Sequence, residues 1–279
     1  MKFLLREWSA DRLAQVERAL DAWVAEDAPA GLGDAMRYAV LDGGKRLRPL
    51  LVMAACEAVD GNAGAALRAA CAVELIHAYS LVHDDMPCMD NDILRRGKPT
   101  VHVRFGQARA LLAGDALQAL AFELLTPEDV SVPAVTQAAL CRLLARSAGH
   151  EGMAGGQAID LASIGRALTE DELRRMHRLK TGALLQASVA MGAACGAPDA
   201  AAVAALNAYG AALGLAFQVV DDILDVTADS ATLGKTAGKD AANDKPTYVS
   251  LLGLEPSRVY AAQLLAEALG ALDTSGLPA

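Results

Sequence analysis

Aromatic residues are scarce in this chain, and their scarcity argues against a β-sheet protein. Phe, Trp and Tyr make up 4% of the 279 residues, whereas hydrophobic residues as a whole reach 53%. Strands draw on aromatic and β-branched side chains, while Ala and Leu, which dominate the apolar residues here, favour helices. The composition and the helical spacing of apolar residues therefore predict an all-α protein of about ten to twelve helices. Ser9, Thr126 and Thr169 are the candidate N-caps of three of these helices, Thr169 in a capping box with Glu172. No linker, repeat or low-complexity tract interrupts the sequence, so we expect one domain over residues 1–279.

Positive charge is also in short supply, which excludes nucleic acid as an expected partner. The chain has 25 Lys and Arg against 34 Asp and Glu, for a net charge of −9. Binding nucleic acid through its phosphates needs a basic surface. An acidic protein can still bind a small phosphorylated ligand, because a metal ion and a few local cations reverse the sign of the potential inside one pocket.

The cysteines lack the spacing of a disulfide framework or a zinc site. Five are present, an odd number, and no two follow a CxxC pattern. Reduced thiols in apolar surroundings are the expected state. The N-terminus, MKFLLREWSADR, has too short an apolar stretch for a signal peptide. The cytoplasm is therefore the expected location.

One long uncharged run is a candidate membrane span. Residues 200–220 contain no charged side chain and could cross a bilayer by length. The run carries Asn207 and Gln218, however, and leads directly into Asp221 and Asp222. We therefore expect no membrane span here, but a central helix buried on all sides by other helices.

Two aspartate-rich clusters carry the strongest chemical signal. Each follows a long apolar stretch and is followed in turn by basic residues. The first is Asp84, Asp85 and Asp90, before Arg95 and Arg96; the second is Asp221, Asp222 and Asp225, before Lys235. Carboxylates this close repel one another unless a cation neutralises them, and Mg²⁺ prefers such oxygen ligands. The clusters predict a metal-assisted site for a substrate that bears phosphate.

Helical geometry predicts how each cluster is arranged. Asp221 and Asp225 are four residues apart and fall on one helix face, with Asp222 rotated by about 100°. Asp84 and Asp90 are six apart, and Pro87 between them cannot continue a regular helix. A local bulge around Pro87 is needed to return Asp90 to the position of Asp84.

A glycine-flanked run of cations supplies a second candidate anion site. In the segment GGKRLRP, Lys45 and Arg48 are three residues apart and can grip one anion together. The run is not a Walker loop. Gly234-Lys235-Thr236 is not one either, because Asp229 stands where that loop requires glycine.

The histidines are expected to bind rather than to react. His83, beside Asp84, is expected to be a structural hydrogen-bond partner rather than a metal ligand. His77 lies one to two turns before the aspartates and could donate to a phosphate. The sequence contains no HExxH motif, nucleophile elbow or Cys/His pair, so covalent catalysis is not expected.

Six segments follow one another between about Gly43 and Tyr248: GGKRLRP, IHAYSLVHDDMPCMDNDILRRGKPT, AGGQAID, HRLKTGAL, FQVVDDILD and LGKTAGKD. In this order they resemble the trans-isoprenyl diphosphate synthases, and within that family most of all the bacterial farnesyl diphosphate synthases.

The resemblance implies a fold and an activity. The fold would be a bundle of helices around a central cavity, in a homodimer. The enzyme would be a farnesyl diphosphate synthase, which condenses isopentenyl diphosphate with dimethylallyl or geranyl diphosphate. Three Mg²⁺ ions, with Mn²⁺ as an alternative, would assist ionisation, condensation and elimination.

The resemblance also implies roles for individual residues. Asp84, Asp90 and Asp221 would hold Mg²⁺, supported by Asp85, Asp222 and Asp225. The allylic diphosphate would be bound by Arg95, Lys180, Lys235 and Lys245, and isopentenyl diphosphate by Lys45, Arg48, His77 and Arg96. Thr181 and Gln218 would lie near the developing allylic cation. Tyr79, with Ser80 beside it, would form the floor that limits product length to fifteen carbons.

Three alternatives stay open. A geranylgeranyl diphosphate synthase would share every motif and differ in product length. A class I terpene cyclase shares the first aspartate-rich motif, but its second motif is of an Asn/Ser/Glu type that Asp221, Asp225 and Asp229 do not match. A non-catalytic subunit of a heteromeric synthase tends to lose one aspartate-rich motif, and this chain keeps both.

Overall fold

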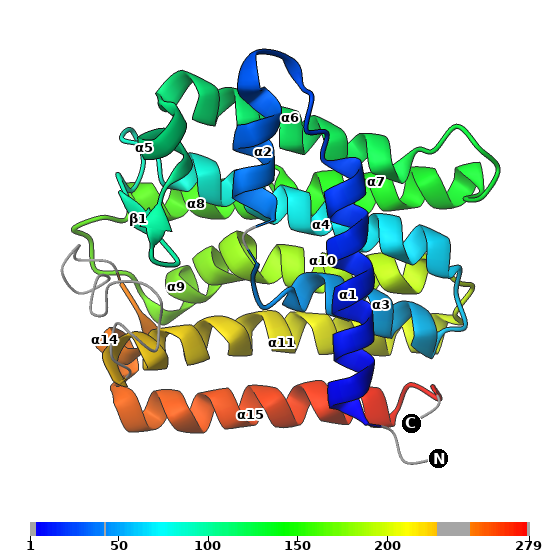
Figure 1. Ribbon diagram of the computed structural model, residues 1–279. Coiled ribbons are helices and arrows are strands. Elements are labelled where there is room, and N and C mark those ends of the chain that lie inside the picture. The colour runs from blue at the N-terminus through cyan, green and yellow to red at the C-terminus, as the bar shows by residue number, and fades with distance from the viewer. Residues whose placement is uncertain (1–3, 42, 228–245, 278–279) are drawn as a thin grey trace. The chain divides into compact units, whose positions relative to one another are not determined.

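The computed structural model describes residues 4–41, 43–227 and 246–277, and most of these are α-helical (Figure 1). The all-α prediction is confirmed. The contacts divide the chain into a first unit, Met1–Cys141 with Met191–Ala197, and a second unit, Arg142–Ala190 with Pro198–Ala279. The expectation of a single domain stays a prediction. Lys235 and Lys245 lie outside the described residues.

The described helices are distributed over the two units. The first unit contains α1 (Leu5–Trp23), α2 (Leu32–Val40), α3 (Leu47–Ala58), α4 (Ala63–Asp84), α5 (Val101–Phe105), α6 (Gln107–Leu125) and a 3₁₀ turn, η1 (Pro29–Gly31). The second contains α8 (Met153–Ala162), α9 (Glu170–His177), a π-helical turn, η2 (Arg178–Gly182), α11 (Ala200–Thr227), α14 (Tyr248–Leu252) and α15 (Leu254–Asp273). Two further helices, α7 (Ala134–Ala148) and α10 (Ala183–Ala194), have residues in both.

Helix α4 is the centre of the first unit. Asn62 caps its N-terminus by accepting a hydrogen bond from the backbone N–H of Ala65. Alanines at 65, 66, 69, 70 and 72 are fully or almost fully buried, and small side chains let neighbouring helices approach closely. Figure 1 shows α4 running beside α6, which it contacts along its length. This packing carries the residues before Asp84 deep into the unit.

The core of the second unit lies around α11 and α15, which run side by side (Figure 1). The buried cluster between α9, α11, α14 and α15 consists of Leu168, Leu173, Met176, Leu215, Ala216, Val219, Tyr248 and Leu264. Within the chain as described, α11 is not buried on all sides, because Val203 and Val220 are about two-fifths exposed (41% and 42%). The expectation of an all-round buried helix was wrong. The apolar faces of a helix need not all be covered within one chain.

Two helices are apolar and long enough to cross a membrane by length and composition alone. They are α4, with 72% of its apolar window buried, and α11, with 39% buried. The core helix of a soluble protein meets the same criteria, so this finding is weak evidence for a span.

Local capping signals gave mixed results. The Thr169–Glu172 capping box predicted from sequence opens α9 as expected. Ser9 was expected to cap the first helix, but α1 begins at Leu5 and the Ser9 hydroxyl donates to the carbonyl of Arg6 inside it. Thr126 was expected to open a helix; instead its hydroxyl donates to the carbonyl of Phe122 at the end of α6. Both hydroxyls bond backward along the chain, a use that competes with capping.

A short hairpin follows the first aspartate cluster, and the sequence did not predict it. Strands β1 (Leu94–Arg95) and β2 (Lys98–Pro99) pair antiparallel, with Leu94 opposite Pro99. The turn residues Arg96 and Gly97 both have positive φ, 53° and 76°. Two-residue hairpin turns of this kind usually have the sequence Asn-Gly or Gly-Gly. Because arginine takes the first position here, the sequence does not show the usual hairpin pattern.

Candidate functional site

The chain after α4 folds back onto the end of that helix. The backbone N–H of Asp90 donates to the carbonyl of Asp84 at 2.8 Å, and that of Asp92 donates to the carbonyl of Asp85 at 3.1 Å. The predicted bulge around Pro87 is therefore present. It returns Asp90 to the C-terminal end of α4, although the two residues are six apart in sequence.

Asp85 has a different environment from its neighbours. Its side chain is 3% exposed and accepts three hydrogen bonds from Arg95 of β1, at 2.6 to 3.0 Å. Burial alone would lower the pKa of Arg95, but the bonds to Asp85 and the charges of Asp84 and Asp90 raise it. Arg95 is therefore a permanent cation held beside the first aspartate cluster.

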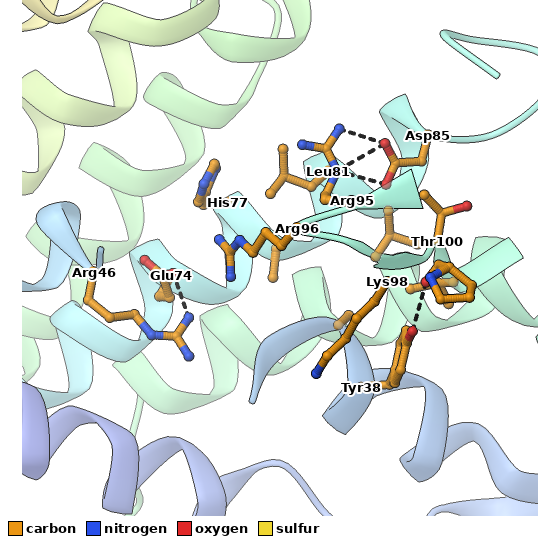
Figure 2. Close-up of a pocket in the computed structure, with 15 residues that line it drawn as sticks. Tyr38, Arg46, Glu74, His77, Leu81, Asp85, Arg95, Arg96, Lys98 and Thr100 are labelled. Carbon is orange, nitrogen blue, oxygen red and sulfur yellow. Dashed lines mark hydrogen bonds and ion pairs between the residues drawn. The ribbon is translucent and has the colours of Figure 1, made fainter. Parts of the chain in front are cut away.

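A cavity open to solvent lies in the first unit between α2, α4 and the hairpin. Figure 2 shows the Arg46–Glu74 pair at one side of this view and the Asp85–Arg95 pair at the other, with His77 and Arg96 between them. Arg96 donates a hydrogen bond to the carbonyl of Gly43 and so ties the hairpin turn to the GGKRLRP segment. Several cations thus gather around one cavity of an acidic protein.

The electrostatics of this cavity favour an anion. Burial lowers the pKa of His77 well below its usual value, and the charges of Arg48, Arg96 and Arg95 lower it further. Burial also lowers the pKa of Arg48, against the opposing charge of Glu74. The Nε of Arg48 is buried without a hydrogen-bond partner among the described residues. Buried donors are nearly always hydrogen-bonded, so this Nε is a candidate to bind an acceptor on a ligand. Lys45, three residues earlier in the sequence, is exposed.

The second unit places Lys180 and Thr181 on the π-helical turn η2. The Lys180 ammonium pairs with Asp160 of α8 at 2.6 Å, and the Asp160 side chain is 5% exposed. A Cβ at Gly156 would collide with the backbone nitrogen of Lys180, so only glycine lets α8 lie this close to η2. Turns of π-helix are frequent at functional sites.

A chain of hydrogen bonds links η2 to the second aspartate cluster. The Thr181 hydroxyl donates to Gln218 Oε1 at 2.9 Å, and Gln218 Nε2 donates to Asp222 Oδ1 at 2.8 Å. The other oxygen of Asp222 accepts from the backbone N–H of Tyr248 at 2.8 Å. A second cavity, also open to solvent, is lined by Asp160, His177, Lys180, Gln218, Asp222, Pro246 and Thr247.

The three aspartates of α11 differ in their surroundings. Helix α11 continues to Thr227, so the predicted helical spacing of Asp221 and Asp225 is confirmed. Asp222 is buried and bonded as described above, while Asp225 is 4% exposed and its Oδ1 has no hydrogen-bond partner in the described part of the chain. Within residues 4–41, 43–227 and 246–277, no three His, Cys, Asp or Glu side chains converge into a metal site. Mg²⁺ commonly takes one or two protein carboxylates and completes its shell with water and phosphate.

Tyr79 and Ser80 lie on α4 one turn before its end. The ring of Tyr79 meets the ring of His83 edge to face at 5.7 Å, and burial raises the pKa of Tyr79. A ring nitrogen of His83 bonds the carbonyl of Leu111 on α6 at 3.1 Å, in agreement with its expected structural role. The Ser80 hydroxyl donates to the carbonyl of His77.

Sequence reasoning missed several residues that shape these two clusters of side chains. Arg46 and Glu74 line the first cavity, and Asp160 and His177 line the second. Asp160 lies in the quoted segment AGGQAID, whereas Glu74 lies three residues before His77, just outside the second quoted segment. Their roles depend on partners 20 to 28 residues away, which no local pattern identifies.

The all-α fold thus places one aspartate-rich helix end in each unit, that of α4 in the first and that of α11 in the second, each with an ion-paired cation nearby. A family model for polyprenyl synthetases matches residues 29–275. The chain belongs to the polyprenyl synthetase family.

Relatives within the family carry two product names. A probable farnesyl diphosphate synthase of Sinorhizobium fredii is 51% identical over 267 residues, covering 94% of this chain and 80% of the relative. Geranylgeranyl pyrophosphate synthase 4 of Arabidopsis thaliana is 48% identical over 197 residues, covering 70% of this chain and 52% of the relative. The matched part of this chain thus spans about half the length of that plant protein.

Solved structures agree on the fold. An apo FPP/GFPP synthase from Zymomonas mobilis has a TM-score of 0.86 at 42% identity, over 96% of this chain and 92% of the other. A geranyltransferase from Helicobacter pylori, complexed with magnesium and isoprenyl diphosphate, has a TM-score of 0.86 at 35% identity, over 98% and 92%.

Proposed function

We propose that the protein is a Mg²⁺-dependent prenyltransferase that makes farnesyl diphosphate from isopentenyl diphosphate and dimethylallyl or geranyl diphosphate. The observation that carries the proposal is the segment after α4, which folds back onto the C-terminal end of that helix. It holds Asp84 and Asp90 together beside Arg95, in the same unit as a cation-lined cavity. Relatives named farnesyl diphosphate synthase support the proposal.

The proposed ligands of Mg²⁺ are Asp84, Asp90 and Asp221. Their carboxylate oxygens suit this hard cation, and Asp225, one turn after Asp221 on α11, offers an Oδ1 that has no hydrogen-bond partner among the described residues. When bound, Mg²⁺ would neutralise the negative charge that develops on the departing diphosphate. The solved geranyltransferase of Helicobacter pylori, complexed with magnesium and isoprenyl diphosphate, supports this choice of ion.

Fixed cations would share that work at the allylic diphosphate. Arg95, oriented by Asp85, and Lys180, oriented by Asp160, are held before the substrate arrives. Preorganised charge costs no rearrangement at the moment of reaction. Lys235 and Lys245 would add to this set. Thr181 and Gln218 would present their dipoles to the allylic cation.

Isopentenyl diphosphate would bind through Lys45, Arg48, His77 and Arg96. The carbon–oxygen bond of the allylic substrate breaks, its diphosphate leaves, and the terminal alkene carbon of isopentenyl diphosphate forms the new carbon–carbon bond. Loss of one proton then restores the alkene, and the released diphosphate is the proposed acceptor. Apolar walls such as that of α4 would keep water from the cation.

Product length separates the first proposal from geranylgeranyl diphosphate synthase, the second candidate. One turn of helix rises about 5.4 Å, close to one isoprene unit. Tyr79 lies five residues before Asp84 and packs edge to face on His83, so a chain growing along α4 would meet a braced ring. This ring favours the fifteen-carbon product.

The proposal also includes a cytoplasmic location and a homodimeric state.

The test is a turnover assay with purified protein, Mg²⁺, radiolabelled isopentenyl diphosphate and either allylic diphosphate. Wild type should form farnesyl diphosphate, and chelation of Mg²⁺ should abolish it. Asp84→Asn should lose activity by at least about 100-fold, whereas Asp11→Asn on the exposed face of α1 should not. A wild-type protein that binds substrates without turnover would favour a non-catalytic subunit, and a hydrocarbon product would favour a cyclase.

A further inference from the structure

Arg46 differs from the two cations beside it. Lys45 is exposed, whereas Arg46 is 4% exposed and turns into the first unit. Its φ of 45° lies in the left-handed region, and it is the residue that precedes the first turn of α3. Left-handed backbone at an arginine is costly and persists only where surrounding contacts hold it.

Those contacts are four hydrogen bonds to three different elements. Arg46 Nε and Nη2 donate to the two oxygens of Glu17 on α1, at 2.7 and 3.2 Å. Nη1 donates to Glu74 on α4 at 2.7 Å, and Nη2 also donates to the carbonyl of Val40 at the end of α2 at 2.6 Å. The guanidinium thus joins α1, α2 and α4 at the point where the GGKRLRP segment enters α3.

The network also affects the net charge of the residues that line the cavity. Glu74 lines the same cavity as His77 and Arg96, and its side chain is 5% exposed. A bare carboxylate there would repel a diphosphate. The bond from Arg46 offsets this charge; Arg46 also pairs with Glu17, which is 39% exposed and therefore screened by solvent. Among the other charged residues of the lining, Arg95, Arg96 and Lys98 outnumber Asp85.

Arg46 has little capacity left for a ligand, because its donors are committed to Glu17, Glu74 and Val40. Lys45 and Arg48 are in the opposite condition. Lys45 is exposed, and Arg48 keeps a buried Nε without a partner among the described residues. The segment therefore divides its three cations into one anchor and two available donors.

We propose that Glu74 and Glu17 are positioning residues for the binding of isopentenyl diphosphate. Acting through Arg46, they hold residues 43–48 so that Lys45 and Arg48 face the diphosphate, and Glu74 is kept neutralised in the process. This role of Glu17, Glu74 and Arg46 requires no direct contact with the substrate, because their polar atoms bond one another and Val40. This inference rests on the proposed function and extends it to residues outside the expected ligand set.

The first test compares Glu74→Gln with Glu57→Gln. Glu57 also accepts a hydrogen bond from an arginine, Arg12, but on an exposed face of α3 away from the cavity. Glu74→Gln should raise KM for isopentenyl diphosphate about 10-fold, with kcat and KM for the allylic substrate within about twofold. Glu57→Gln should leave all three constants unchanged. Titration calorimetry with isopentenyl diphosphate should show the same loss of affinity without turnover.

A second pair of variants separates positioning from folding. Glu17 is 39% exposed, so Glu17→Gln should fold normally and still raise KM for isopentenyl diphosphate about threefold. Arg46→Met with Glu74→Leu replaces the buried pair by apolar groups, which can preserve stability. This double variant should keep the wild-type melting temperature yet bind isopentenyl diphosphate at least about 10-fold more weakly.

The outcomes distinguish this inference from the proposed function. Unchanged affinity for isopentenyl diphosphate in Glu74→Gln, Glu17→Gln and the double variant would overturn the positioning role. An equal rise in KM for both substrates would also overturn it, because a general structural defect would then explain the data. A wild-type protein without turnover would refute the proposed activity alone, since the calorimetric comparison would still report on the anchor.

Discussion

Replacing Asp160 by Asn tests whether a buried carboxylate positions Lys180. The two side chains are 2.6 Å apart, with Asp160 5% and Lys180 26% exposed. The amide keeps the shape of the carboxylate but removes its charge. Lys180 would lose the charged partner that holds its ammonium, on η2, in the lining of the cavity it shares with Gln218 and Asp222.

The size of the effect follows from the burial of the pair. A hydrogen bond to a charged partner contributes about 1.5–3 kcal/mol. If the transition state loses the whole of this hydrogen-bond energy, kcat/KM should fall by about 10- to 100-fold. Breaking a fully buried pair costs about 3–5 kcal/mol, and the quarter exposure of Lys180 reduces this to about 2 kcal/mol of stability. That corresponds to a decrease in melting temperature of about 4–8 °C.

Steady-state kinetics and thermal unfolding of the same preparations would measure both effects. Glu151→Gln is the matched control, because it makes the same chemical change in an exposed pair with Arg146 at 3.4 Å. Such a pair contributes little, so neither quantity should change measurably. Wild-type kcat/KM in Asp160→Asn, with or without a lower melting temperature, would refute the positioning of Lys180 by Asp160.

Two further predictions concern the product and the pH dependence of stability. Tyr79→Ala should remove the ring that packs on His83 and release products of twenty carbons or more, measured by chromatography of the dephosphorylated alcohols. His177 is 6% exposed, and burial lowers its pKa from 6.5 to about 4. The folded protein therefore binds the proton less well than the unfolded chain, and His177 should cost about 3 kcal/mol of stability as the pH falls from 6.5 to 4. Urea unfolding of His177→Phe should show a shallower loss over that range.

Each of these predictions has a control and a contrary result. Tyr209→Ala, on α11, should leave the product at fifteen carbons. An unchanged product in Tyr79→Ala would show that Tyr79 does not limit product length. The phenyl ring at 177 keeps the stacking on Tyr248, whose centroid lies 5.5 Å from that of His177. Parallel pH profiles for wild type and His177→Phe would show that His177 is not the group responsible.

The parts predicted well from sequence are those that depend on neighbours along the chain. The capping box at Thr169 needs only Glu172 three residues later, and the spacing of Asp221 and Asp225 needs only a continuous helix. The return of Asp90 to Asp84 followed from Pro87, which ends the regular backbone between them. The caps expected at Ser9 and Thr126 failed because each hydroxyl had a backbone acceptor behind it as well as a donor ahead.

The sequence by itself determined the helical class of the protein, the two aspartate clusters and the cations that accompany them. Helix periodicity and carboxylate chemistry act within a few residues, and so they can be read from the chain alone. The tertiary structure decided which of three adjacent cations becomes an anchor. Arg46 turns inward because Glu17 and Glu74, 29 and 28 residues away, are brought to it by the packing of other helices. Buried charge requires a partner, and only the folded chain supplies one.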